Sequence, residues 1–319
     1  MADDLGAGLV TVDDVRAAAG SIAGRAVRTP LLPCGVDGHL LLKPESLQPV
    51  GSFKIRGATH AVARLSAVQR SRGVVTHSSG NHGQALAYAA RAAGVACTVV
   101  IPDVAPPVKI AQVRALGATV VLVPPAQRSA EAERLAADGG LTLIPPYDHR
   151  DVIAGQGTVG LEIVEDLPDV DVVLVPVGGG GLASGVATAV TALCPKAVVI
   201  GVEPELAADA RESLAGGGLV SWPVEQTYRT VADGVRTGLS ELTFAHLRAR
   251  LETVVTVSEE EIRAGVTRLV RDCRLVAEPS GAVSVAAALF HGGELPGGRT
   301  VAVVSGGNID PGLLAELLA

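Results

Sequence analysis

The sequence predicts an α/β fold built on an open, doubly wound parallel sheet. Short apolar runs rich in β-branched residues recur along the chain, and helical patterns of roughly 10 to 15 residues separate them. Three of these helical patterns end at glycines, Gly94, Gly117 and Gly139, where helices commonly stop. Strands that alternate with helices in this way form parallel βαβ units with helices on both faces of the sheet.

The first four strands follow one another closely. We expect strands at 73–79, 96–102, 119–124 and 141–145, with helices at 82–93, 107–116 and 128–137 between them. This set is compact enough to be a small domain inserted into a larger one.

The later part of the chain continues the alternation. We expect a helix at 151–166, a strand at 171–177, a helix at 181–193 and strands at 197–204 and 300–306. Open parallel sheets bind ligands at the carboxyl ends of their strands, so the motifs that follow the strands are the candidates for a site.

Composition excludes several classes of function. The 319 residues carry a net charge of −7 and only 2% aromatic residues, so nucleic-acid binding by phosphate neutralisation or base stacking is not expected. No apolar run reaches the roughly 18 residues of a membrane helix, and the acidic N-terminus does not resemble a signal peptide. The four cysteines are scattered without a CxxC pair, which favours a reducing cytoplasm and a role as small core residues.

A lysine in the stretch "GSFKIRGA" (51–58) lies where an apolar side chain is expected. If the stretch continues as a helix, one apolar stripe comprises Lys54, Ala58, Ala61, Val62 and Leu65, whereas Arg56, His60 and Arg64 lie off it. A buried ammonium is costly unless it is paired or neutralised. Either the head of Lys54 reaches water, or its amine performs chemistry that a guanidinium cannot.

Four consecutive glycines follow an apolar strand in "PVGGGGLASG" (176–185). Glycine lets the backbone approach an anion closely, and the N-terminus of the next helix supplies free N–H groups. The segment lacks the Lys-Ser/Thr of a Walker loop and fits a dinucleotide motif poorly, so a single phosphate monoester is the expected guest. The alternative is a tight strand–helix turn without a ligand.

Three further motifs follow strands. "SSGNHGQA" (78–85) suits a carboxylate or a plain helix cap, and "VSGGNID" (304–310) places the neutral hydroxyl of Ser305 at a strand end or in an ordinary turn. In "GVEPELAAD" (201–209), Glu203 and Asp209 flank a loop that forms either an oxygen cage for a hard cation or a solvated acidic surface. One ligand, an aldehyde that carries a phosphate, would account for most of these motifs. Pyridoxal phosphate forms a Schiff base with lysine and binds its phosphate in a glycine-rich loop.

The motifs resemble a known family. "GSFKIRGA", "SSGNHGQALAYAA", "PVGGGGL", "EPSGA" (278–282) and "VSGGNID" look like those of the serine/threonine dehydratase and serine racemase group of fold-type II pyridoxal-phosphate enzymes, in family order. The resemblance implies a tryptophan synthase β-like α/β fold with two open twisted sheets flanked by helices. It also implies a large cofactor-binding domain at 1–67 and 146–319 and a small domain at 68–145. The family is typically dimeric, so a homodimer is expected.

The resemblance implies a role for each matched position. Lys54 would carry the cofactor and act as the base, and Ser79 matches the second acid–base group of the racemases. Around the cofactor ring would lie Phe53, Asn81, Glu278 and Ser305, with Asn81 at the phenolic oxygen and Ser305 at the pyridine nitrogen. The phosphate would be cupped by Gly178, Gly179, Gly180, Gly181 and Leu182. The substrate carboxylate would be seated by Ser78, Asn81 and His82, largely through backbone N–H groups. "VADGVR" (231–236) resembles a family segment near the active site. Glu203, the Ala207 carbonyl and Asp209 match the family's Mg²⁺ or Ca²⁺ site.

These roles imply dehydration and deamination of L-threonine to 2-oxobutanoate and of L-serine to pyruvate. Serine racemase and 3-hydroxyaspartate dehydratase are the alternatives within the group. A β-replacement enzyme related to cysteine synthase is disfavoured by the motif around Lys54. A non-catalytic amino-acid or nucleotide sensor is disfavoured by the intact lysine, and a nicotinamide enzyme by the absence of a clean GxGxxG motif. We therefore expect a cytoplasmic ammonia-lyase with a small amino-acid substrate.

Overall fold

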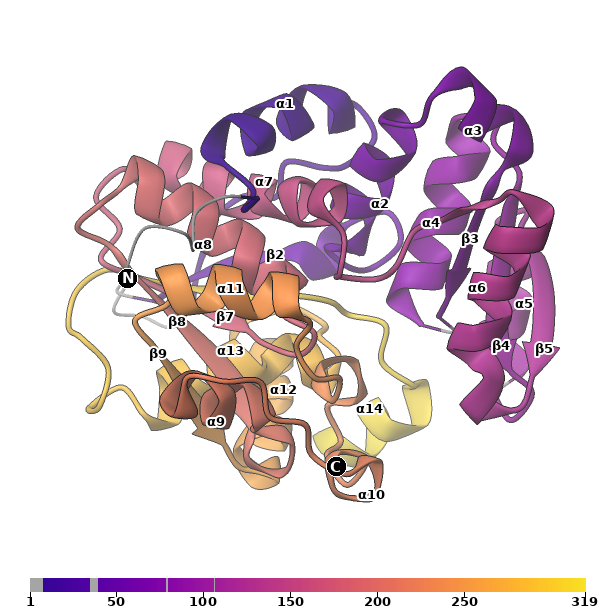
Figure 1. Ribbon diagram of the computed structural model, residues 1–319. Helices are drawn as coiled ribbons and strands as arrows, with labels where there is room; N and C mark the ends of the chain where they lie inside the picture. The colour runs from indigo at the N-terminus through magenta and orange to yellow at the C-terminus, as the bar shows by residue number, and fades with distance from the viewer. Residues whose placement is uncertain (1–7, 35–39, 79, 106) are drawn as a thin grey trace.

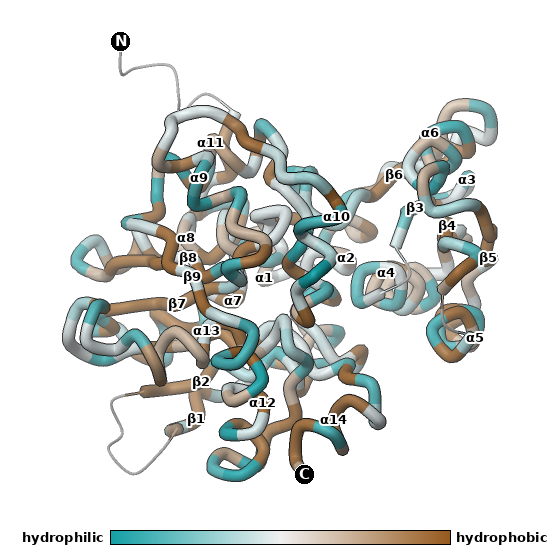
Figure 2. The backbone as a smooth tube through the Cα atoms, turned by 90° about the horizontal axis from the view of Figure 1, so that it is seen from below, coloured by the Kyte–Doolittle hydropathy of each residue, from teal (hydrophilic) through white to brown (hydrophobic). Residues whose placement is uncertain are grey.

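Two separate sheets organise the chain. The computed structural model describes residues 8–34, 40–78, 80–105 and 107–319. The larger sheet has the order β1-β2-β10-β7-β8-β9, and its strands are β1 (Leu32–Pro33), β2 (Leu40–Pro44), β7 (Val172–Pro176), β8 (Val198–Pro204), β9 (Thr253–Val257) and β10 (Thr300–Val304). All neighbours in it are parallel except β1 and β2. Both faces of β7 are covered, and the strand is hydrophobic throughout (Figure 2).

The smaller sheet lies in a lobe of its own. Its order is β5-β4-β3-β6, all parallel, and its strands are β3 (Val74–His77), β4 (Cys97–Pro102), β5 (Thr119–Val123) and β6 (Thr142–Leu143). The sheet and its helices form a lobe on one side of the molecule in both views (Figures 1 and 2). Its four strands fall inside the 68–145 segment; the domain boundaries themselves stay a prediction.

Helices cover both faces of both sheets. The smaller sheet is covered by α3 (Ala67–Arg72), α4 (Asn81–Ala92), α5 (Pro107–Ala115) and α6 (Arg128–Gly139). One side of the larger sheet carries α1 (Val12–Ile22), α2 (Lys54–Ala63), α7 (Arg150–Asp166), α8 (Gly181–Leu193) and α11 (Glu241–Arg250). The other side carries α12 (Glu259–Cys273), α13 (Pro279–Phe290) and α14 (Pro311–Leu318), and α9 (Asp209–Gly216) and α10 (Val224–Thr227) lie near the edge. The predicted α/β class is confirmed.

The stripe predicted for α2 is wrong for two residues. The helix packs against α1, α4 and α7, so it is buried on nearly every side. Arg56 and His60 are buried, although both were expected off the buried face. The Arg56 guanidinium is satisfied by Glu45 and Glu162, which a helical pattern read from α2 alone does not reveal. Lys54, at the first turn, is partly exposed to a cavity.

The close approach of α2 and α7 requires glycine. A Cβ on Gly155 would lie 2.6 Å from the Cα of Gly57 and 2.8 Å from the carbonyl oxygen of Arg56. The pair of helices therefore forms a rigid support beneath Lys54. Among the described residues, no helix is both long enough and apolar enough to span a bilayer.

Candidate active site

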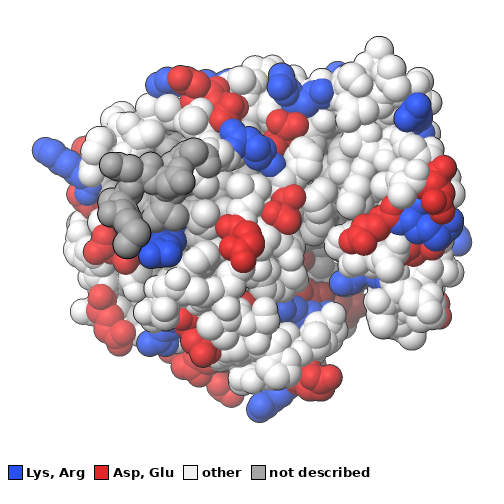
Figure 3. Space-filling model, viewed as in Figure 1, with Lys and Arg blue, Asp and Glu red and all other residues white. Residues whose placement is uncertain are grey.

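A cavity of about 1030 Å³ separates the two lobes. The molecular surface is hollowed between the two lobes, and charged side chains of both signs surround the hollow (Figure 3). Its walls come from the carboxyl ends of β3, β7 and β10 and from the N-termini of α2, α4 and α8. This is the edge at which open parallel sheets hold their ligands.

Lys54 is the first residue of α2, and its Nζ lies in this cavity. Nζ donates to the carbonyl oxygen of Pro146 at 2.8 Å and stands 4.9 Å from the ring centroid of Phe53. No carboxylate lies within ion-pair distance of Nζ among the described residues. Burial without a counter-charge lowers the pKa of Lys54 to about 8, so the neutral amine is accessible near physiological pH.

The glycine loop forms the opposite wall. Gly178, Gly179, Gly180, Gly181 and Leu182 all line the cavity, and Gly180 has a φ of +84°. The α8 helix begins at Gly181 without a side-chain cap, so its first N–H groups face the cavity with no side chain bonded to them. A Cβ on Gly178 would lie 2.7 Å from the Cα of Val235. Packing alone therefore already requires glycine at that position.

A second uncapped helix N-terminus enters the same cavity. The α4 helix begins at Asn81 with Gly80 before it, and Ser78, Asn81 and His82 all line the cavity. His82 donates from Nε2 to the carbonyl oxygen of Ile144 at 3.0 Å. Burial and, secondarily, the Lys54 charge lower the pKa of His82 to about 3, so this ring stays neutral. The predicted Ser79 lies outside the described residues.

Asn81 bridges the two lobes. Its Nδ2 donates to Oε1 of Glu278 at 2.6 Å, and its Oδ1 accepts from Nδ2 of Asn308 at 2.7 Å. Burial, and then the Asp233 carboxylate, raises the pKa of Glu278 to about 7. The cavity therefore favours the neutral form of this carboxyl group more than water does.

Ser305 follows β10 and is buried at the cavity wall. Its hydroxyl donates to the carbonyl oxygen of Ser280 at 3.3 Å, and its own carbonyl accepts the backbone N–H of Phe53 at 3.1 Å. The segment before Lys54 is thus fixed to the end of β10. The group at this position is neutral, as the sequence predicts.

Several cavity residues were not identified from the sequence. Tyr147 packs against Gly179 and Gly181, and Lys109 forms an ion pair of 3.6 Å with Asp233 across the two lobes. Arg128 begins α6 and lines the cavity. Tyr147 lies two residues after the predicted strand 141–145, and Asp233 lies in the "VADGVR" segment, so position alone could have signalled these two.

The comparisons with known proteins bear on this site directly. The family model described as "Pyridoxal-phosphate dependent enzyme" matches residues 22–306. The chain belongs to this family. It is 43% identical to a putative threonine dehydratase of Sinorhizobium fredii, with 97% of this chain and 95% of that protein covered. It is 39% identical to L-threo-3-hydroxyaspartate ammonia-lyase of Saccharomyces cerevisiae, with 97% and 96% covered.

A solved structure gives the same picture of the fold. The chain is similar to serine racemase from Dictyostelium discoideum at 37% identity and a TM-score of 0.88, with 94% of this chain and 99% of that chain covered. The pyridoxal-phosphate-dependent enzymes to which the chain is related are therefore ammonia-lyases and racemases of the serine/threonine type.

The cavity fits the cofactor of this family. It offers a lysine amine with a lowered pKa and an uncapped helix N-terminus for a phosphate. It also offers a neutral hydroxyl at a strand end. The chemistry of these groups matches an aldehyde, a dianionic phosphate and a pyridine nitrogen, respectively.

The residues predicted for a cation lie together but apart from Lys54. Glu203 ends β8 and is buried, and its carboxylate accepts the N–H groups of Ala210 at 3.1 Å and Arg211 at 2.8 Å. Ala207 and Asp209 are buried beside it. Within the described ranges, no group of three or more His, Cys, Asp or Glu side chains could hold a metal, so a cation here would depend on backbone oxygens as well.

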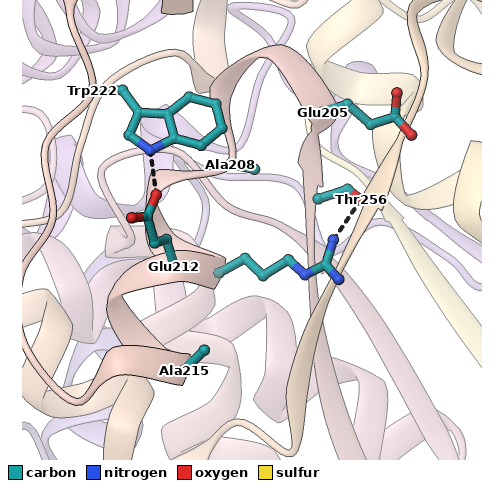
Figure 4. Close-up of a pocket in the computed structure, with 7 residues that line it drawn as sticks. Glu205, Ala208, Glu212, Ala215, Trp222 and Thr256 are labelled. Atoms are coloured by element: carbon teal, nitrogen blue, oxygen red, sulfur yellow. Dashed lines mark hydrogen bonds between the residues drawn. The ribbon is translucent and has the colours of Figure 1, made fainter.

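A pocket of about 470 Å³ opens along α9, and Glu205, Glu212 and Trp222 are among the residues that line it (Figure 4). Trp222 donates from Nε1 to Oε2 of Glu212 at 2.6 Å, and Arg211 donates to Oγ1 of Thr256 at 3.1 Å. The pocket contains none of the groups around Lys54, so we place the candidate active site in the larger cavity.

Proposed function

We propose that the protein is an ammonia-lyase that eliminates water from L-threonine and L-serine and releases 2-oxobutanoate or pyruvate with ammonia. The observation that supports this most is the convergence of Lys54 Nζ with two uncapped helix N-termini in one cavity. One N-terminus suits a phosphate and the other suits an α-carboxylate. When bound, pyridoxal phosphate supplies an electron sink for the pair of electrons left at Cα.

Each cofactor group has a partner in this proposal. Lys54 would hold the cofactor covalently, and the glycine loop with Leu182 would bind its phosphate. Asn81 would contact the phenolic oxygen, with Phe53 and Glu278 beside the ring. Ser305 would face the pyridine nitrogen, and a neutral hydroxyl would leave this nitrogen largely unprotonated, which favours rapid elimination over a long-lived carbanion.

The chain's own groups account for the proton movements. The neutral Lys54 amine takes the proton from Cα, and its lowered pKa keeps a large fraction of the amine available near pH 8. The β-hydroxyl leaves with one proton as water. The remaining enamine tautomerises to an imine, which water hydrolyses to the keto acid and ammonia, so no oxidant or reductant is needed.

The substrate carboxylate would lie at the N-terminus of α4. Because burial keeps His82 neutral, binding would rely on backbone N–H groups and the helix dipole rather than on a charged side chain there. Ser78 and Asn81 would contribute to this seat from the same turn.

Arg128 favours a second candidate substrate, L-threo-3-hydroxyaspartate. Its Nε is buried with no hydrogen-bond partner among the described residues, and no ion pair to it is formed there. Burial, and then the positive charge of Arg128, lowers the pKa of His77, so the guanidinium lies near that ring. An unmatched guanidinium in the cavity would bind a second carboxylate bidentately. The similarity to a hydroxyaspartate ammonia-lyase supports this possibility.

The experiment is a substrate panel. Protein loaded with cofactor is incubated separately with L-threonine, L-serine and L-threo-3-hydroxyaspartate, and keto acid and amino-acid chirality are both measured. Keto acid from threonine with little D-serine supports the lyase. D-serine formed faster than pyruvate would instead make the protein a serine racemase, and no product from any substrate would refute the proposal.

One variant separates the two substrates. Arg128→Gln should lower kcat/KM for hydroxyaspartate about 100-fold and change that for threonine less than about threefold, since a desolvated charged hydrogen bond is lost for only one of them. Arg236→Gln is the matched control, because Arg236 lines the same cavity but its guanidinium already has a partner. Its Cζ lies 3.7 Å from the centroid of the Tyr228 ring. An equal loss for both substrates on Arg128→Gln would contradict the assignment.

We also propose Glu203, Asp209 and the carbonyl of Ala207 as a site for Mg²⁺ or Ca²⁺. Hard oxygen donors suit these ions. Trp222, the only tryptophan of the chain, is hydrogen-bonded to Glu212 of α9, the helix that begins at Asp209, and should report cation binding by a saturable fluorescence change. Asp209→Asn should abolish the fluorescence change, whereas the control Glu252→Gln should retain it. If Asp209→Asn gave the same titration curve as the wild type, the proposed cation site would be wrong.

A further inference from the structure

Two cysteines far apart in the sequence meet in the folded chain. Sγ of Cys34 and Sγ of Cys273 lie 2.8 Å apart, although 239 positions separate the residues. Both are free thiols in the structure. Their separation is only slightly longer than the roughly 2.05 Å of a disulfide bond, so a small side-chain rotation suffices to join them.

The location of the pair leaves both residues partly exposed. Cys34 follows β1 and donates its backbone N–H to the carbonyl oxygen of Leu40 at 2.9 Å, and Cys273 is the last residue of α12. Both side chains pack at the margin of the core beneath the larger sheet and are partly exposed. Each of the two residues therefore has some surface in contact with solvent.

The other two cysteines form an internal contrast. Cys97 and Cys194 are buried, and within the described part of the chain neither lies against another cysteine. Cys194 directs its thiol to backbone carbonyl oxygens of Pro168 and Val170. These two residues behave as small core side chains, which is what the sequence suggests for all four.

We propose that Cys34 and Cys273 form a reversible modification site at which a small-molecule disulfide oxidises the pair to an intramolecular disulfide. The thiolate of one of the two cysteines attacks one sulfur of the reagent, and the first small thiolate leaves. The other cysteine then loses its proton and attacks the modified Sγ, and the second small thiolate leaves. The pair loses two electrons and two protons, and the reagent is reduced to two thiols.

The two thiols interact directly in the reduced protein. Burial, and then the hydrogen bond with Cys273, raises the pKa of Cys34 to about 12. The reaction therefore requires that one of the two thiols lose its proton to the solvent.

The bond would connect distant parts of the larger lobe. It would join the edge strand β1 to the C-terminus of α12, from which Arg274, with a φ of +60°, begins the short segment leading to Glu278. Because it closes a very long loop, it should raise Tm by about 5 °C or more. This inference does not depend on the proposed reaction.

The test treats the full-length, cofactor-loaded protein with oxidised glutathione or oxidised dithiothreitol. We expect the total number of free thiols per chain, measured after denaturation, to fall from four to two. We also expect peptide mapping without reductant to recover a Cys34–Cys273 cross-link, and dithiothreitol to restore the four thiols and the original Tm.

Matched variants complete the experiment. Cys34→Ser and Cys273→Ser should each lose the cross-link and the Tm increase, whereas Cys194→Ser should keep both. If a serine variant folds poorly, the wild-type cross-link map alone still decides the question. Glutathione adducts on separate cysteines without a cross-link, or four unreacted thiols, would overturn the proposal.

Discussion

Arg56 holds together a buried network of charges beneath the active site, and replacing it with methionine should destabilise the protein strongly. Its Nε donates to Glu45 at 2.7 Å and its Nη1 to Glu162 at 2.6 Å, while Lys43 donates to Glu162 at 2.7 Å. Two cations thus face two carboxylates, and Arg56, Lys43 and Glu45 have no exposed surface.

The magnitude follows from the charge that remains. Methionine preserves most of the volume but leaves two buried carboxylates with one lysine. Removing one partner of a buried ion pair typically costs about 3–5 kcal/mol of unfolding free energy. At roughly 2 °C for each kcal/mol in a protein of this size, Tm should fall by about 6–10 °C.

The loss should also depend on pH. Burial alone would raise the pKa of Glu45, but Arg56 holds it below its usual range, so the wild-type network stabilises the protein above the carboxyl range and weakens as pH falls. Without Arg56, the pKa of Glu45 should rise instead, and the variant should lose stability as pH increases. The gap between the two proteins should therefore be larger at pH 8 than at pH 5.

Thermal and urea unfolding at both pH values measure these effects. The double variant Glu45→Gln with Arg56→Met restores the charge balance, so it should be more stable than Arg56→Met alone by about 1–3 kcal/mol. If Arg56→Met unfolds within about 1 kcal/mol of the wild type at pH 8, the reasoning from buried charge is wrong.

Three further predictions concern the site and its support. The rate at which cofactor attaches to the apo-protein should rise from pH 7 to 9 with an apparent pKa of about 8, because only neutral Lys54 reacts; a rate still rising steeply at pH 10 would contradict the lowered pKa. Gly155→Ala should cost about 1–3 kcal/mol of unfolding free energy, because its new methyl group would collide with α2. Gly20→Ala should be neutral or stabilising, because a Cβ at Gly20 meets nothing within 4 Å. Equal urea midpoints for the two variants would refute the packing argument. Lys109→Met should lower the unfolding free energy by less than about 1 kcal/mol, since its ion pair is well exposed, and a calorimetric loss above 2 kcal/mol would show a larger role.

The sequence predicts residues that line the cavity better than it predicts the contacts that support them. Lys54 and the glycine loop, which both line the cavity, could be found because each combines an unusual residue with a strand end or a helix start. The predicted helices at 82–93, 151–166 and 181–193 agree with α4, α7 and α8 to within one residue at each end. In these segments local periodicity and the buried face coincide.

What could not be predicted depends on contacts between distant segments. Arg56 is buried because Glu45 and Glu162 approach it from two other elements, and a pattern within one helix carries no information on them. The strands β1, β2 and β9 and the helices α1, α3 and α9 to α14 were not assigned from the sequence, and most of them take their places by packing on the larger sheet. The contact of Cys34 with Cys273 exists only in the folded chain.

Whether Lys54 carries the cofactor can be tested directly, because the chain contains only four lysines, Lys43, Lys54, Lys109 and Lys196. Cofactor-loaded protein is reduced with borohydride, which fixes the cofactor onto the lysine that holds it, and the peptides are analysed by mass spectrometry. We expect a phosphopyridoxyl group on Lys54 alone, and we expect Lys54→Arg to lose both this group and keto acid formation. A label on another lysine, or full activity of Lys54→Arg, would contradict this expectation.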